Sequence, residues 1–260
     1  MTLSAPQSPA AARPLALVTG AAVRIGRAIS LALASAGYDL IVHTRHPGPA
    51  ASSIGGEIEA RGARAHLVHA ELSDAAAVAA LLPACARFGV VRLLVNNASE
   101  FHPDAAGSLS PELWNRHFAV NLRAPVFLAE AFAAQLPAGE TGAVVNLIDQ
   151  RVLKPTPHYL SYSLTKQGLW AATRLLAQSL APRVRVNAVS PGPTFANSRQ
   201  SLEDFARQSA SVPLGRGPQP EEVAAAVLFL ARAESVTGQM LTVDGGQHMA
   251  WQTPDTEVPD

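Results

Sequence analysis

The sequence of 260 residues has little charge and almost no cysteine: charged side chains make up 15% of it, and Cys85 is the single cysteine. One cysteine excludes a disulfide framework and a thiolate metal site, and its apolar surroundings indicate a buried thiol. The 20 basic and 20 acidic side chains balance and form no run of like charge, which argues against a nucleic-acid partner. A hydrophobic content of 48% excludes a disordered body.

Long apolar runs are also lacking. No segment approaches the roughly 18 apolar residues of a membrane span, so we predict no membrane partner. Residues 1–13 have no apolar middle like that of a secretion signal, and we interpret them as a disordered lead-in to a cytoplasmic protein. The eight histidines are scattered without metal-ligand spacing, so we predict no metal.

Short apolar runs alternate with helical patterns along the whole chain. Seven runs have the composition of strands buried on both faces of a parallel sheet. This alternation predicts one doubly wound α/β domain over residues 14–250, with a seven-stranded parallel sheet flanked by helices. The predicted strands are 15–18, 40–43, 65–69, 93–95, 143–148, 184–189 and 240–243, and the predicted helices include 53–61, 75–87, 111–135, 159–181 and 220–231.

Two late segments differ from this pattern. Residues 191–217 are rich in Pro, Gly, Ser and Gln, which is typical of a substrate lid or binding loop. Near the C-terminal tail (251–260), Met249 and Trp251 stand among polar residues. We expect this region to pack on a neighbouring subunit.

The first predicted strand leads into a turn of small residues, Thr19 to Gly26, which precedes a helix. Small residues let the backbone approach a pyrophosphate at a helix N-terminus. Arg24 breaks the dinucleotide pattern G-x-G-x-x-G, and such a turn can be a simple chain reversal. The second strand ends in Thr44-Arg45 with no acid, which favours NADPH, since arginine suits the 2′-phosphate. The alternative is that Arg45 is a solvated surface side chain.

Tyr162 and Lys166 are four residues apart in a predicted helix, so the phenol and the ammonium share one face. With only two lysines and three tyrosines in the chain, this spacing indicates a functional pair, although a surface pair is the alternative. A nearby cation is expected to lower the pKa of the phenol and make it a usable proton donor. We interpret Tyr159, just before this helix, as a capping or packing residue, with substrate contact as the alternative.

Four motifs in order resemble the short-chain dehydrogenase/reductases: TGxxxxxG at 19–26, Asn96-Asn97-Ala98, Tyr162-x-x-x-Lys166 and Pro191-Gly192. The resemblance covers residues 14–250. It implies a Rossmann-type domain, NAD(P)-dependent hydride transfer, and a homotetramer or a dimer.

The resemblance also implies roles for single residues. Tyr162 becomes the proton donor, Lys166 holds the nicotinamide ribose and tunes the phenol, and Asn121 supports a proton-relay water. Glu71-Leu72 stands where the family has an aspartate and an apolar residue near the adenine. The implied cofactor contacts are Gly20, Arg24, Ile25, Thr44, Arg45, Glu71, Leu72, Asn97, Ala98, Ser99, Tyr162, Lys166, Pro191, Gly192 and Thr194.

Asp149 departs from the family, which usually has a serine thirteen residues before the tyrosine. A carboxylate repels a developing alkoxide and opposes ionisation of Tyr162, but it can deliver a proton to a basic ring nitrogen. Together with Arg24 and with Phe101 after Asn96-Asn97-Ala98-Ser99, it resembles the pteridine reductase branch. In that branch the phenylalanine stacks on the pterin, the arginine contacts the phosphate and the substrate, and the serine contacts both the cofactor and the substrate.

The sequence therefore predicts an NADPH-dependent reductase of a C=N bond in a dihydropterin or dihydrofolate-like substrate, with Arg24, Ser99, Phe101, Asp149 and Tyr162 as substrate contacts. One alternative is a carbonyl reductase of a small ketone or 3-oxoacyl thioester, with Phe101 as plain pocket lining. The other is a non-catalytic NADP-sensing regulatory protein. A sensor does not need Tyr162, Lys166 and Asn121, so their presence argues against it.

Overall fold

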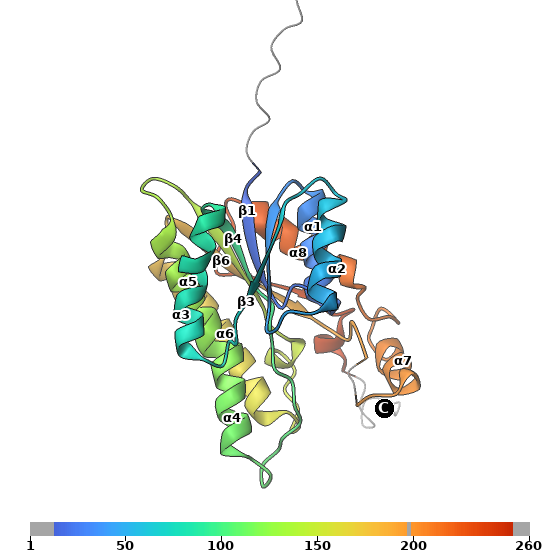
Figure 1. The fold of residues 1–260 in the computed structure, drawn as a ribbon. Coiled ribbons are helices and arrows are strands. Elements are labelled where there is room, and N and C mark those ends of the chain that lie inside the picture. Colours follow the sequence, from blue (N-terminus) through green and yellow to red (C-terminus); the bar gives the residue numbers. More distant parts are fainter. Residues whose placement is uncertain (1–12, 197–198, 252–260) are drawn as a thin grey trace, which may run out of the picture.

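The computed structural model describes residues 13–196 and 199–251, so most of the predicted lead-in and tail lies outside the described residues. Seven strands form one parallel sheet in the order β3-β2-β1-β4-β5-β6-β7 (Figure 1). Each predicted strand is present, which confirms the predicted sheet. The strands are β1 (Leu15–Thr19), β2 (Asp39–Thr44), β3 (Ala65–His69), β4 (Val91–Asn96), β5 (Gly142–Leu147), β6 (Val184–Pro191) and β7 (Met240–Val243).

Helices cover both faces of the sheet, so the strands are buried from two sides (Figure 1). On one face, Ile29 and Leu33 pack with Val18 of β1, and on the other Leu128 and Phe132 pack with Leu17. No helix within the described ranges combines the length and apolar character that crossing a membrane requires. One face carries α1 (Arg24–Ser35), α2 (Pro49–Glu59) and α8 (Pro220–Arg232), and the other carries α3 (Ala75–Cys85), α5 (Ala124–Gln135) and α6 (Leu160–Ser179).

The predicted helix 111–135 is wrong as a single element. It consists of α4 (Pro111–Phe118), a π-helical turn η2 (Ala119–Arg123), and α5. Apolar periodicity does not reveal a π turn, because the extra residue in the turn leaves the flanking patterns helical. The turn carries Asn121, whose buried amide group donates to the Glu100 carbonyl at 2.9 Å and accepts from the Glu100 N–H at 2.8 Å.

Segment 191–217 contains a helix that the sequence analysis missed, α7 (Leu202–Ala210). Ser201 caps it by accepting a hydrogen bond from the Asp204 N–H at 3.0 Å. None of the α7 residues is buried, and Leu202 is among the exposed ones, so α7 adds no residue to the apolar core.

Candidate active site

The strand order reverses between β1 and β4, and the carboxyl ends of the strands there border a cleft of about 1000 Å³. Ligands of open α/β sheets bind in the crevice at such a switch point. The cleft brings together the predicted site residues, with the exception of Thr44 and Asn121. Thr44 bonds to the His46 carbonyl and the His69 ring, and Asn121 lies behind the cleft on Glu100.

The turn after β1 is held tightly against the loop after β4. The Thr19 hydroxyl accepts from the N–H groups of Asn97 at 2.9 Å and Ala98 at 3.0 Å. Gly20 has φ +62°, and a Cβ there would lie 3.0 Å from the Ala98 Cα, so glycine is required. The backbone thus leaves α1 with its N-terminus open to the cleft, which suits a phosphate.

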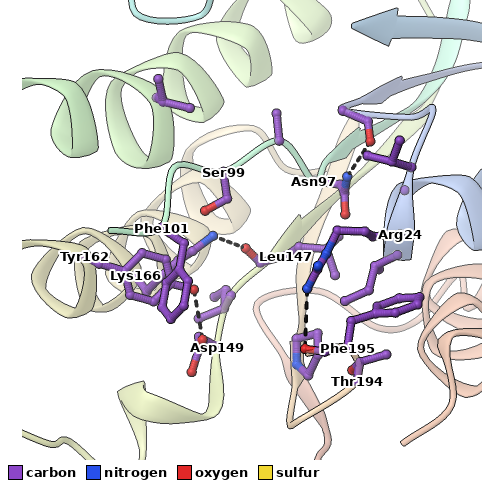
Figure 2. A pocket seen from close by; sticks show the side chains of 18 of the residues that line it. Arg24, Asn97, Ser99, Phe101, Leu147, Asp149, Tyr162, Lys166, Thr194 and Phe195 are labelled. Carbon is purple, nitrogen blue, oxygen red and sulfur yellow. Dashed lines mark hydrogen bonds between the residues drawn. The ribbon is translucent and has the colours of Figure 1, made fainter. Parts of the chain in front are cut away.

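Arg24 stands in the left-handed region at φ +52°, where the dinucleotide pattern would have glycine. Its guanidinium crosses the cleft and donates to the Phe195 carbonyl at 3.4 Å (Figure 2). It also donates to the Ala196 carbonyl at 2.9 Å. It also lies 5.1 Å from the centre of the Phe195 ring. Arg24 therefore connects the turn after β1 to the segment after β6, and its strained backbone belongs to the wall of the site.

His43, at the end of β2, supports the same turn and was not among the predicted site residues. Its ring is buried and lies between the Gly20 N–H, 3.3 Å from Nδ1, and the Ala70 carbonyl, 3.0 Å from Nε2. Because the N–H of Gly20 can only donate, Nδ1 accepts and Nε2 carries the proton of a neutral ring. Burial lowers the pKa of His43 to about 4, in line with that neutral state.

Lowering the pH from 7 to 5 is expected to reduce the free energy of unfolding by about 2 kcal/mol through His43. In the unfolded state the ring has a pKa near 6.5 and is mostly protonated at pH 5, whereas the folded ring, with a pKa of about 4, is mostly neutral there. The contribution of the neutral His43 ring to the free energy of unfolding is therefore complete above pH 6.5 and is lost as the pH falls toward 4. Urea unfolding at both pH values measures the difference.

The matched variants are His43→Asn, which cannot become charged, and His158→Gln, which removes an exposed histidine. His43→Asn should lose about 2 kcal/mol less than the wild type between pH 7 and 5. His158→Gln should keep the wild-type dependence. Equal pH dependence in the wild type and His43→Asn would contradict the assignment.

Directly after β2, Arg45 is held by two carboxylates. Its Nε lies 3.2 Å from Glu71, its terminal nitrogen contacts Glu100, and Arg116 contacts Glu100 at 2.7 Å. Burial opposes charge on Glu100, but the hydrogen bond from Arg116 and the charge of Arg45 outweigh it, so the pKa of Glu100 is lowered. Arg45 is thus a paired cation in the cleft wall, and its charge faces the site.

The Tyr162 hydroxyl donates to the Asp149 carboxylate at 2.8 Å (Figure 2). Tyr162 and Lys166 lie on α6 as predicted, and both are buried. The Lys166 ammonium donates to the Leu147 carbonyl at 2.8 Å and lies 5.7 Å from the centre of the Tyr162 ring. The three side chains therefore meet where β5 ends.

The expected lowering of the Tyr162 pKa is wrong in this structure. Burial and the adjacent Asp149 carboxylate raise the pKa of Tyr162 well above 10. Burial also lowers the pKa of Lys166 to about 8, against the attraction of Asp149. The Asp149 carboxylate contacts the phenol directly, whereas the Lys166 ammonium binds the Leu147 carbonyl. The carboxylate therefore affects the pKa of Tyr162 more than the ammonium does, in the direction that the sequence indicated for Asp149.

Phe101 and two residues that were not predicted as contacts form the substrate end of the cleft. Phe101 stacks on Tyr159 with the ring centres 4.4 Å apart and meets Tyr162 edge-on at 4.7 Å. Arg151 lies 5.4 Å from the centre of the Phe101 ring and binds the Asp149 carboxylate at 3.0 Å. Tyr159 thus lines the cleft rather than only packing. Two local features distinguish the residues around Phe101. The backbone of Tyr159 has a φ of +60°, and Arg151 follows Asp149 by two residues.

The described part of the chain contains no group of three or more His, Cys, Asp or Glu side chains that could hold a metal ion.

Known proteins resemble the chain over nearly its whole length. A family model described as enoyl-(acyl carrier protein) reductase matches residues 20–248. The crystal structure of FolM alternative dihydrofolate reductase 1 from Brucella suis in complex with NADP is 48% identical, has a TM-score of 0.90, and covers 94% of this chain and 98% of that chain. The corresponding Brucella canis structure, complexed with NADP, is 47% identical with a TM-score of 0.88 and covers 95% and 99%.

A second kind of relative shares less of the sequence. The 3-oxoacyl-(acyl-carrier-protein) reductase FabG of Staphylococcus aureus is 32% identical over 240 residues, which cover 90% of this chain and 98% of that protein. These matches confirm the resemblance drawn from the four motifs. The chain belongs to the short-chain dehydrogenase/reductase family.

Proposed function

We propose that the protein is an NADPH-dependent reductase that transfers a hydride to a C=N bond of a dihydropterin or dihydrofolate-like substrate. The observation that carries the proposal is the 2.8 Å hydrogen bond between Tyr162 and Asp149 in the cleft. A carboxylate in this place disfavours a developing alkoxide and favours transfer of a proton to nitrogen. The two Brucella neighbours at almost half identity, named as alternative dihydrofolate reductases, support the same reading.

The cleft suits NADPH. The Gly20 turn and the open N-terminus of α1 offer backbone N–H groups to a pyrophosphate, and a side chain at position 26 would collide with the Gly20 carbonyl at 2.0 Å. No acid ends β2 to bind a ribose 2′-hydroxyl, and Arg45 there matches a 2′-phosphate. Glu71 and Glu100 hold Arg45, so its guanidinium is already oriented where it would bind a 2′-phosphate.

Bound NADPH supplies the hydride, and one proton then completes the conversion of C=N to CH–NH. Asp149 would take that proton from solvent water and pass it to the ring nitrogen, so the carboxylate is ionised before and after the transfer. Tyr162 keeps its own proton, because its pKa is raised by burial and by Asp149, and it orients the carboxylate through their hydrogen bond. Lys166, fixed on the Leu147 carbonyl, holds the nicotinamide ribose, and Phe101 offers a flat surface on which a pterin stacks.

A carbonyl reductase of 3-oxoacyl thioesters is the second candidate, because FabG relatives share about a third of the sequence. In that reaction Tyr162 would protonate the developing alkoxide directly. The Asp149 carboxylate beside it opposes the negative charge of that alkoxide, which is why we favour the C=N substrate. The homotetramer and the cytoplasmic location stay predictions.

Oxidation of NADPH, followed at 340 nm with a panel of substrates, tests the proposal. The panel contains dihydrobiopterin, dihydromonapterin, dihydrofolate and an acetoacetyl thioester, each with NADPH and with NADH. We expect turnover of at least one pterin or folate, with kcat/KM for NADPH at least tenfold above that for NADH. Turnover of the thioester alone would replace the proposal with the carbonyl reductase, and binding of NADPH without any turnover would favour the sensor.

A further inference from the structure

Three buried polar side chains outside the cleft lie between the two segments that carry Phe101 and Tyr162. Asp104 comes from the loop after β4, His117 from α4, and Ser161 from the first turn of α6. His117 and Ser161 are fully buried, and Asp104 is 7% exposed. None of the three lines the cleft. Burying polar groups is costly unless all of them are hydrogen-bonded, so their pairing defines the local arrangement.

The hydrogen bonds among them run in one direction. The His102 N–H donates to Nε2 of His117 at 3.2 Å, and Nδ1 of His117 lies 2.6 Å from the Ser161 hydroxyl oxygen. The Ser161 hydroxyl in turn contacts the Asp104 carboxylate. A backbone N–H can only donate, so Nε2 accepts and Nδ1 carries the proton of a neutral ring. The Ser161 hydroxyl accepts from that proton and donates its own to Asp104.

The same residues anchor the start of α6. Tyr159, its N-terminal cap, makes no capping hydrogen bond through its side chain. Asp104 takes over this task, since its carboxylate accepts from the Ser161 N–H at 3.1 Å, and its carbonyl accepts from the Leu160 N–H at 3.3 Å. The first turn of the helix that carries Tyr162 is therefore held by a residue 57 positions earlier in the chain.

Two members of the chain of hydrogen bonds adjoin cleft residues. His102 follows Phe101, and Ser161 precedes Tyr162. The rings of Phe101 and Tyr162 meet edge-on at 4.7 Å. The His117 ring itself lies 6.2 Å from the Tyr162 ring. A change in these buried hydrogen bonds would therefore move the Phe101 ring relative to the Tyr162 hydroxyl.

We propose that Asp104, His117 and Ser161 are positioning residues that fix the Phe101 ring relative to the Tyr162 hydroxyl, with His117 neutral and protonated at Nδ1. The proposal rests on the reductase function of the cleft. None of the three touches the ligands, so their effect passes through the loop after β4 and the first turn of α6. A positioning role predicts that turnover suffers while the adenine end of the cleft keeps its affinity for NADPH.

The test compares Ser161→Ala with Ser163→Ala in the full chain. Ser163 is a buried serine on the same helix whose hydroxyl makes no hydrogen bond to the described residues. With the best substrate of the panel, Ser161→Ala should lower kcat at least tenfold and raise the substrate KM, while the NADPH dissociation constant, measured by fluorescence titration, stays within twofold. Ser163→Ala should keep wild-type values of all three. Equal behaviour of the two variants, or a matching loss of NADPH affinity in Ser161→Ala, would overturn the positioning role.

A second measurement does not depend on turnover. Nitrogen-15 NMR of the histidine-labelled wild type at pH 7 should show His117 as a neutral ring with the proton on Nδ1, with the signal assigned by its loss in His117→Asn. An imidazolium, or a neutral ring protonated at Nε2, overturns the proposal. If the substrate panel fails while this tautomer is present, the proposed function is wrong and the hydrogen-bond chain stands.

Discussion

Replacing Tyr162 with phenylalanine is expected to lower kcat for the reduction of a dihydropterin about a thousandfold, within the range found for loss of general acid–base catalysis, because Asp149 depends on this phenol for its orientation. The variant keeps the ring that contacts Phe101 and removes only the hydroxyl that donates to Asp149. Asp149 then loses the hydrogen bond that orients it. Because the groups at the adenine end are unchanged, KM for NADPH should change less than threefold. Steady-state kinetics with saturating NADPH measure both constants.

The matched control is Tyr38→Phe. Tyr38 lies just before β2, away from the cleft residues, and should tolerate the loss of its hydroxyl. A loss of less than tenfold in Tyr162→Phe would show that the phenol neither donates nor orients in the reaction. A thousandfold loss in both variants would point to damage of the fold instead, which the unfolding midpoint reports.

The second large effect concerns Asp149. Asp149→Asn keeps the size of the side chain and an oxygen that accepts from Tyr162, but an amide cannot exchange the proton. Turnover of the pterin should therefore fall about a hundredfold or more. The pKa of Tyr162 should also fall, because one of the two main causes of its elevation, the carboxylate charge, is gone. Kinetics of the variant across pH 6 to 10 measure both changes.

Asp149→Ser, which installs the usual residue of the family, separates the two candidate functions. The hydroxyl can donate to a carbonyl oxygen, so reduction of an acetoacetyl thioester should persist or rise while pterin turnover is lost. Asp74→Asn serves as the control, because Asp74 is an exposed carboxylate that caps α3 and an asparagine there still accepts a hydrogen bond. Pterin turnover that survives both substitutions of Asp149 would mean that another group delivers the proton.

The sheet could be predicted from the sequence because its strands are buried on both faces and appear as unbroken apolar runs. The segment 93–95, for example, corresponds to the centre of β4. Two elements had no such signal. The residues of α7 are all at least partly exposed, and the π turn at Asn121 is stabilised by bonds to Glu100, which lies 21 residues away. Local patterns do not contain such distant contacts.

The site was predictable wherever fixed spacings placed chemistry on one element or at one sheet edge. The placement of Tyr162 and Lys166, four residues apart on α6, is of this kind. The place of Asp149 followed from the family resemblance. The ion pairs of Glu100 were not predictable, because its partners Arg45 and Arg116 come from other segments. Glu100 itself stands between two predicted contacts, Ser99 and Phe101. The sequence named two opposing influences on the pKa of Tyr162, the Lys166 cation and the Asp149 carboxylate, but it did not show which of them is larger. Charge and burial are properties of the assembled site.

The central position of β1 has a consequence for how the chain is made. β1 is synthesised before the other strands of the sheet, yet it pairs with both β2 and β4, so one of its edges has no partner until residues 91–96 follow. The turn at Gly20 depends on the same event, because Asn97 and Ala98 bind Thr19. Pairings across such long stretches form slowly and leave an apolar strand edge open to other chains. A nascent chain that stalls before β4 is therefore a hazard for aggregation and not a partly working enzyme.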